Sequence, residues 1–188
     1  STYQALRCGL ALADLIGDPQ PEWESAAGLL KHAVCEHPEV FMDKSTFSMD
    51  WYYPVLGGAV SGQAAADLVA SRWEEFIIPG FGARCVSDRP WMTGAETAEL
   101  AIGLIINGQQ EVASQLLADI QCLRREDGAY WTGIVVDEMK FFPYEASTWT
   151  AAAVVLACDA LAGGSTLDLF SGRDLPVGLP FDTEACQR

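Results

Sequence analysis

The sequence predicts an all-α protein built as an array of helical hairpins. Four glycines stand in a similar local setting and are spaced 45, 46 and 55 residues apart: Gly17, Gly62, Gly108 and Gly163. Each follows a small, apolar run, and the first three precede an amphipathic run, as expected where glycine supplies the left-handed conformation that ends a helix. A repeat of this length is typical of stacked helix pairs.

Two kinds of helix alternate along the predicted array. Apolar runs with few charges precede the glycines, and because a helix that is apolar nearly all round is buried, we expect inner helices there. They occupy residues 5–16, 51–60, 94–107 and 146–162. Runs with one apolar stripe follow the first three glycines and predict half-exposed outer helices over residues 21–36, 63–77 and 109–125. The array therefore contains about three and a half hairpins.

Long connections join the hairpins at the end opposite the glycine turns. They span residues 37–50, 78–93 and 126–145 and hold most of the aromatic residues. Loops longer than about 12 residues in a compact domain are usually functional, so we expect one functional rim beside the N-termini of the inner helices. Within the third connection, residues 130–144 favour a short β-hairpin. We expect residues 1–164 to form the domain and residues 165–188 to form an irregular C-terminal tail.

Composition argues against several classes of function. The 188 residues are 50% hydrophobic and 20% charged, which predicts a globular domain with a sizeable core. A formal net charge of −15 argues against nucleic acid as a partner. The longest apolar runs, residues 100–106 and 151–158, are too short for a transmembrane helix, and the N-terminus lacks a signal-peptide pattern. We therefore expect no membrane span and a cytoplasmic location.

Neither a cofactor nor a metal is expected. The six cysteines are scattered without a Cys-x-x-Cys pair, which indicates buried, reduced thiols. His32 and His37 lie on and just after an outer helix, with no matching cysteine to complete a zinc site. The sequence also lacks a Gly-x-Ser-x-Gly elbow and a glycine-rich phosphate loop.

Three carboxylates are the catalytic candidates: Asp50, Glu96 and Glu145. They stand at or near the starts of successive inner helices, 46 and 49 residues apart, so the repeat places all three at one end of the array. Two explanations remain open. The carboxylates cap exposed N–H groups and balance the helix dipoles, or two of them face one cavity, where burial and mutual repulsion leave one as an acid and one as a base.

The second long connection and the rim aromatics supply the substrate-binding candidates. Arg84 and Arg89 are suited to grip a phosphate or carboxylate, unless they pair with Asp88 or Glu96 and only pin the loop. Rim aromatics can stack on sugar rings, steady a carbocation or pack in the core. The candidates are Trp51, Tyr52, Tyr53, Arg84, Asp88, Arg89, Trp91, Tyr130, Trp131 and Trp149.

Three stretches resemble a known group of proteins. Residues 48–58 (SMDWYYPVLGG), 84–96 (RCVSDRPWMTGAE) and 127–133 (DGAYWTG) look like bacterial proteins of the prenyltransferase and squalene-cyclase-repeat group, in the α/α-toroid superfamily. The likeness covers about residues 2–162 and implies an (α/α) toroid-like fold. The chain departs from the group at Asp50, which stands alone where class II cyclases have Asp-x-Asp-Asp, and it lacks the zinc ligands of protein prenyltransferases.

A full toroid of this kind has five or six hairpins, so we expect a missing N-terminal half or closure by pairing with another chain, for example as a homo-oligomer. The first hypothesis for function is a prenyltransferase- or terpene-cyclase-like enzyme that acts on an apolar, isoprenoid substrate through Asp50, Glu96 and the aromatic rim. The second is a carbohydrate-active, six-hairpin glycosidase-like protein that uses the same carboxylates on a sugar. The third is a non-catalytic interaction module. A closed apolar cavity favours the first, an open polar cleft with Trp and two carboxylates the second, and a flat aromatic face the third.

Overall fold

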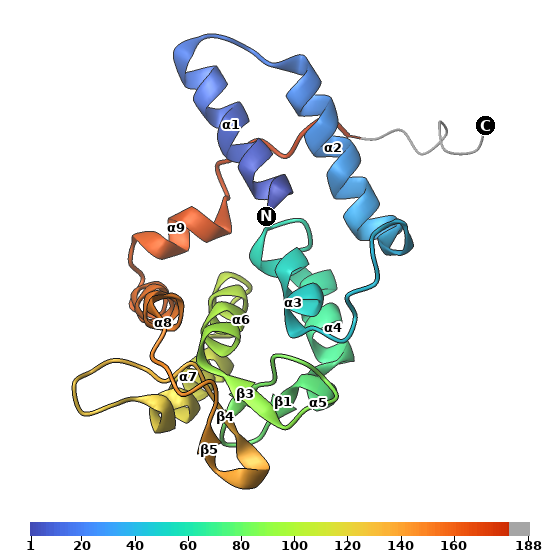
Figure 1. Ribbon diagram of the computed structural model, residues 1–188. Coiled ribbons are helices and arrows are strands. Elements are labelled where there is room, and N and C mark those ends of the chain that lie inside the picture. The colour runs from blue at the N-terminus through green and yellow to red at the C-terminus, as the bar shows by residue number, and fades with distance from the viewer. Residues whose placement is uncertain (181–188) are drawn as a thin grey trace.

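The structure is a computed structural model that describes residues 1–180, and it is mostly helical (Figure 1). Its α-helices are α1 (Thr2–Ile16), α2 (Pro21–Glu36), α3 (Ser48–Leu56), α4 (Gly62–Ser71), α5 (Trp73–Phe76), α6 (Gly94–Ile106), α7 (Gln110–Asp119), α8 (Thr148–Leu161) and α9 (Ser165–Ser171). Three 3₁₀ turns are η1 (Pro38–Val40), η2 (Ile120–Leu123) and η3 (Val136–Glu138). The prediction of a helical, toroid-like array of hairpins is confirmed.

Helix α6 lies at the centre of the core. Every residue from Gly94 to Ile105 is buried except Glu99. Because this helix is apolar nearly all round, neighbours can cover it on every side, and it packs against α3, α7, α8 and α9. Helices α1 and α2 form a hairpin with a smaller cluster of its own around Tyr3, Leu10 and Ala27, and Figure 1 shows this hairpin set apart from the α6-centred core.

The turn at Gly17 matches the prediction, whereas Gly62 does not end a helix. Gly17 ends α1 with a φ of 70°, and its N–H donates to the last carbonyls of the helix. Gly62 is instead the first residue of α4, because α3 already ends at Leu56 rather than near residue 60. Two consecutive glycines follow, and Gly58, with a φ of 71°, takes the left-handed conformation that stops the helix.

Short strands tie the long connections together at the rim. The expected hairpin in residues 130–144 exists as β4 (Gly133–Val135) and β5 (Lys140–Phe141), which pair antiparallel. Strand β3 (Trp91–Thr93), from the second connection, pairs with β4 and completes a three-stranded sheet. A separate antiparallel pair is β1 (Ile77–Ile78) with β2 (Gly82–Ala83). The pairing of the two connections could not be predicted, because strands of two or three residues are too short to show a period-2 pattern.

The segment expected to be an irregular tail begins with a helix. Residues 165–171 form helix α9, so the expectation of an irregular tail was wrong for them, and residues 181–188 lie outside the described part of the chain. Residues 172–180 pass beside α1 and α2, where the Arg7 guanidinium donates to the carbonyls of Gly172, Leu175 and Pro176. Within residues 1–180 no single helix is long and apolar enough to cross a membrane; α8 and α9 meet that length and composition only together, as a pair bent by 98°.

Candidate functional site

Two adjoining hollows lie beside helix α3. The larger is a cleft of about 1000 Å³ between α1, α2, the loop after η1 and α3, and Asp50 lies in its wall. The smaller is a pocket of about 380 Å³ between α1, α6, α8 and α9, and Glu99 lies in its wall. Tyr53 lines both hollows. The two carboxylates therefore stand on either side of one tyrosine.

Glu99 is the carboxylate with the most developed environment. The Tyr52 hydroxyl donates to Glu99 Oε2 at 2.6 Å, and Trp149 Nε1 donates to Oε1 at 3.0 Å. The Tyr53 hydroxyl also interacts with this carboxylate. Burial raises the pKa of Glu99 above its ordinary value, against the opposing effect of these donors. A carboxyl in such a setting can keep its proton at a higher pH than a solvated one.

Glu99 was not among the catalytic candidates predicted from the sequence. Its partners Tyr52, Tyr53 and Trp149 were all candidates, but the carboxylate that they share was not. The available signal was a charged residue in the middle of an otherwise apolar inner helix, which is rarely tolerated without polar partners. Glu99 is the one residue between Gly94 and Ile105 that is not fully buried, and it uses that exposure to reach the pocket.

The local sequence explains how the donors reach Glu99. Tyr52 and Tyr53 are consecutive on α3, and the ring of Tyr52 is buried against α6. Trp149 is the second residue of α8, whose start is fixed by the Ser147 hydroxyl, which accepts from the Thr150 N–H at 3.2 Å. A capped helix start holds the first-turn side chains in place. Three side chains from two helices therefore converge on one carboxylate of a third.

The other two catalytic candidates line neither hollow. Glu96 is 3% exposed, lies in the first turn of α6, and its Oε2 has no hydrogen-bond partner within the described residues. Its carboxylate faces the Cys85 thiol, and burial together with this neighbour raises the pKa of Cys85 to about 12. Glu145 is exposed, and its backbone carbonyl accepts from the Thr132 N–H at 3.1 Å.

Arg84, Asp88 and Arg89 line neither hollow. Arg89 and Asp88 are exposed and lie 3.9 Å apart, and Arg84 Nη1 donates to the Arg89 carbonyl at 3.4 Å. These contacts are within the loop. The Arg89–Asp88 contact is one that the loop-pinning alternative expects, whereas the buried Nε of Arg84 has no hydrogen-bond partner within the described residues.

The remaining aromatic candidates pack within the fold. Trp51 stacks on Phe76, with ring centroids 5.2 Å apart. The Trp91 indole donates to the Phe142 carbonyl at 2.8 Å. Trp131 stacks on Phe141, and the Tyr130 hydroxyl donates to Gln121 Oε1 at 3.0 Å. Of the rim aromatics singled out as candidates, only Tyr53 and Trp149 line either hollow, and Tyr52 donates to Glu99.

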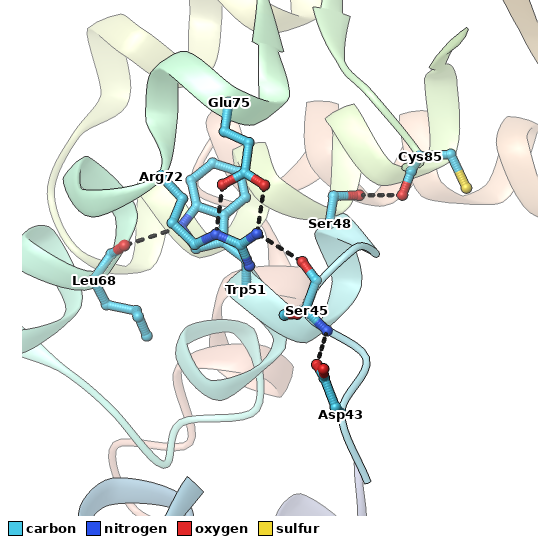
Figure 2. A network of polar contacts seen from close by, with 8 residues as sticks. All are labelled: Asp43, Ser45, Ser48, Trp51, Leu68, Arg72, Glu75 and Cys85. Atoms are coloured by element: carbon cyan, nitrogen blue, oxygen red, sulfur yellow. Dashed lines mark hydrogen bonds and ion pairs between the residues drawn. The ribbon is translucent and has the colours of Figure 1, made fainter. Parts of the chain in front are cut away.

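A polar network holds part of the cleft wall. Figure 2 shows the Arg72 guanidinium donating to both oxygens of Glu75, at 2.8 and 2.6 Å, and to the Ser45 carbonyl at 2.7 Å. Ser45 in turn donates its N–H to Asp43 Oδ1 at 2.9 Å. Because Asp43 and Ser45 line the cleft, Arg72, which lies between α4 and α5, helps to fix that wall. No sequence signal distinguished Arg72 from an ordinary surface arginine.

The described residues offer no group of three or more His, Cys, Asp or Glu side chains that could hold a metal ion. What the site offers is acid–base and aromatic chemistry: one carboxyl with a raised pKa, a second carboxylate across Tyr53, and a tryptophan at the pocket. Glycosidases cleave a sugar chain with a pair of carboxyl groups that flank the bond.

No protein-family model matches this chain. A relative among curated proteins is the MMP endo-(1,4)-3-O-methyl-alpha-D-mannosidase of Mycolicibacterium hassiacum, which is 53% identical over 180 residues. The match covers 95% of this chain and 50% of the relative. The chain therefore spans about half the length of the curated protein that it matches.

This relative overturns the resemblance drawn from the sequence. The chain is similar to a glycosidase, so the assignment to the prenyltransferase and squalene-cyclase-repeat group was wrong, and with it the first hypothesis for function. The misleading features were the apolar inner helices and the aromatic rim. Both are properties of a helical toroid-like scaffold and do not depend on the reaction that the scaffold supports.

Proposed function

We propose that this chain forms part of a glycoside hydrolase that cleaves (1→4) bonds in α-linked chains of 3-O-methylmannose. The observation that supports it most is the 53% identity, over 95% of this chain, to an enzyme whose name states that activity. The proposal replaces the isoprenoid hypothesis with the carbohydrate-active one.

The two carboxylates beside Tyr53 take the catalytic roles. Glycosidases use one carboxylic acid to protonate the leaving oxygen and a second carboxylate to attack the sugar or to activate water. Glu99 is the acid, because its raised pKa keeps it protonated over a wider pH range. Asp50, exposed in the adjoining cleft, is the second carboxylate. Retention or inversion of the product's anomeric centre tells whether Asp50 attacks directly or through water.

The charge of the chain agrees with a neutral sugar. A formal charge of −15 repels anionic ligands such as diphosphates and uronic acids, and the arginines that were expected to bind them lie outside both hollows. A methylated mannose chain has no charge and meets no such repulsion.

The test is hydrolysis of an α-(1→4)-linked 3-O-methylmannose oligosaccharide, followed by chromatography of the products. We expect the purified chain to shorten the oligosaccharide and the variant Glu99→Gln to be slower by at least about 100-fold, since it cannot donate the proton. Glu111→Gln, an exposed residue on the outer helix α7, is the matched control and should keep the wild-type rate.

Two results would contradict the proposal. Wild-type activity in Glu99→Gln would remove Glu99 from the acid role. No hydrolysis by a well-folded chain would favour the non-catalytic interaction module.

A further inference from the structure

The pocket beside Glu99 has an unusual lining for a sugar-binding site. Tyr53, Glu99 and Trp149 form one polar and aromatic part of it. Most of the rest comes from four helices and is apolar: Leu56, Ile102, Ala152, Ala153, Leu156 and Phe170. Its volume of about 380 Å³ is at the lower end of the range for pockets that enclose a small ligand, about 300–1,000 Å³.

The polar groups near the apolar part are largely engaged within the protein. The Gln4 amide, which also lines the pocket, donates to the Leu169 carbonyl at 3.1 Å. The Trp149 N–H is used by Glu99. Glu99 keeps acceptor capacity beyond these contacts, because a protonated carboxyl still has unused lone pairs beside its O–H donor. The pocket can therefore accept a hydrogen bond from a ligand hydroxyl at Glu99 and offers little to a hydroxyl placed against α8 and α9.

This lining distinguishes a methyl ether from a free hydroxyl. A hydroxyl moved from water into an apolar site without a partner loses its hydrogen bonds, whereas a methyl group gains by leaving water. A hexose with one methylated hydroxyl can place the methyl group against the aliphatic side chains and still direct a hydroxyl to Glu99. The larger cleft across Tyr53 is available to the rest of a sugar chain.

We propose that the pocket between α1, α6, α8 and α9 is a subsite that recognises the methyl ether of an O-methylated mannose unit. The inference rests on the proposed function for the kind of sugar and on the pocket lining for the position of the methyl group. It makes Ala152, Leu156 and Phe170 specificity-determining residues, whereas the proposed function assigns them no role.

The probes are two monosaccharides that differ in one methyl group, methyl 3-O-methyl-α-D-mannopyranoside and methyl α-D-mannopyranoside. Neither contains the bond between two sugar units that the proposed enzyme cleaves, so binding is measured without turnover by NMR titration of the full chain. We expect the methylated probe to bind at least about tenfold more tightly, the effect of one methylene in a hydrophobic pocket. Saturation transfer from the protein methyl groups should be strongest at the 3-O-methyl protons.

Two variants locate the effect. Ala152 is exposed on α8 and lines the pocket, so Ala152→Phe should fill it and abolish the preference for the methylated probe. The matched control is Val155→Phe, which adds an aromatic ring on the same helix at a residue that is 66% exposed and does not line the pocket. Leu156→Asn should let the unmethylated probe bind as well as the methylated one, because it supplies a partner for the hydroxyl. Circular dichroism checks that each variant is folded.

Equal binding of the two probes, no binding of either, or an unchanged preference in Ala152→Phe would overturn the inference. These results are separate from those for the proposed function. A chain that hydrolyses methylated and unmethylated chains equally well supports the proposed function and overturns the methyl subsite. A chain that prefers the methylated probe but cleaves nothing supports the methyl subsite and contradicts the proposed function.

Discussion

Opposing effects act on the carboxyl of Glu99. Removal from water raises its pKa and is the largest effect, donation from Tyr52 and Trp149 lowers it, and the nearby Glu96 carboxylate raises it again. The net result is a raised pKa. If Glu99 acts as an acid, activity requires its protonated form and falls as the pH rises through that pKa.

Two substitutions should move the pKa of Glu99 in opposite directions. Tyr52→Phe removes a donor to the carboxylate, so the pKa and the alkaline limb of the activity profile should move to higher pH. Glu96→Gln removes a neighbouring negative charge, so both should move to lower pH. A carbon-13 NMR titration of the Glu99 carboxyl measures the pKa directly. Shifts in the same direction, or none, would show that these neighbours do not set it.

A helix cap and close packing between segments hold the elements around the site in place. The Ser147 cap fixes the beginning of α8, from which Trp149 reaches Glu99. Residues 172–180 lie against α2 so closely that a Cβ on Gly28 would collide with the Leu179 carbonyl. Small residues at such places let one segment approach another.

Loss of the α8 cap should weaken both stability and the site. Ser147→Ala removes the side chain that accepts from Thr150 N–H and should lower the free energy of unfolding by about 1 kcal/mol. Ser147→Asp, which can also cap, should restore most of it. Urea unfolding measures the change, and equal stability of Ser147→Ala and the wild type would exclude a role for the cap.

Two glycine-to-alanine changes in the first hairpin should have opposite signs. Gly9→Ala in α1 meets only the Trp23 ring at 3.6 Å, an ordinary contact, so it should stabilise by roughly 0.5–1 kcal/mol through helix propensity. Gly28→Ala in α2 gains the same propensity but displaces Leu179, and we expect a net loss of about 1–3 kcal/mol. Thermal unfolding of the two variants side by side tests this, and a stable Gly28→Ala would mean that residues 172–180 move away without cost.

Excess negative charge dominates the electrostatics of the whole molecule. The formal charge is −15, while ion pairs such as Lys140–Glu138 and Arg89–Asp88 are largely exposed. Exposed pairs contribute little to the free energy of unfolding, whereas like charges at this density repel one another throughout the folded state.

Closure of the array by another chain or by a missing half stays a prediction.

Salt should therefore stabilise the folded chain. Raising NaCl from about 10 mM to about 200 mM shortens the screening length from about 30 Å to below 10 Å and weakens the repulsion. We expect the Tm to rise by about 2–4 °C, the shift that ~1 kcal/mol produces in a chain of this length. Differential scanning calorimetry at the two salt concentrations measures it. A lower Tm in high salt would mean that attractive pairs outweigh the repulsion.

Most of the helices could be predicted from the sequence because each depends on a local pattern, whereas α9 lies in a segment that was expected to be irregular. The apolar run of α6 predicts burial within its own residues, and Gly17 marks the end of α1 without reference to the rest of the chain. The same repeat led us to expect the aromatic candidates at the rim. Which of them would be functional could not be predicted, since Trp51 and Tyr52 are adjacent and yet one stacks in the core while the other serves Glu99.

By itself, the sequence determined a helical array with long connections at one end and a strong negative charge. Only the tertiary structure decided that Glu99, rather than Glu96 or Glu145, is the carboxylate held at a pocket, because its donors Tyr52 and Trp149 lie 47 and 50 residues away along the chain. The same is true of the apolar pocket, whose wall is shared by five helices. Hydrophobic periodicity is a property of neighbouring residues, whereas a site is made by side chains that meet only when separate elements pack together.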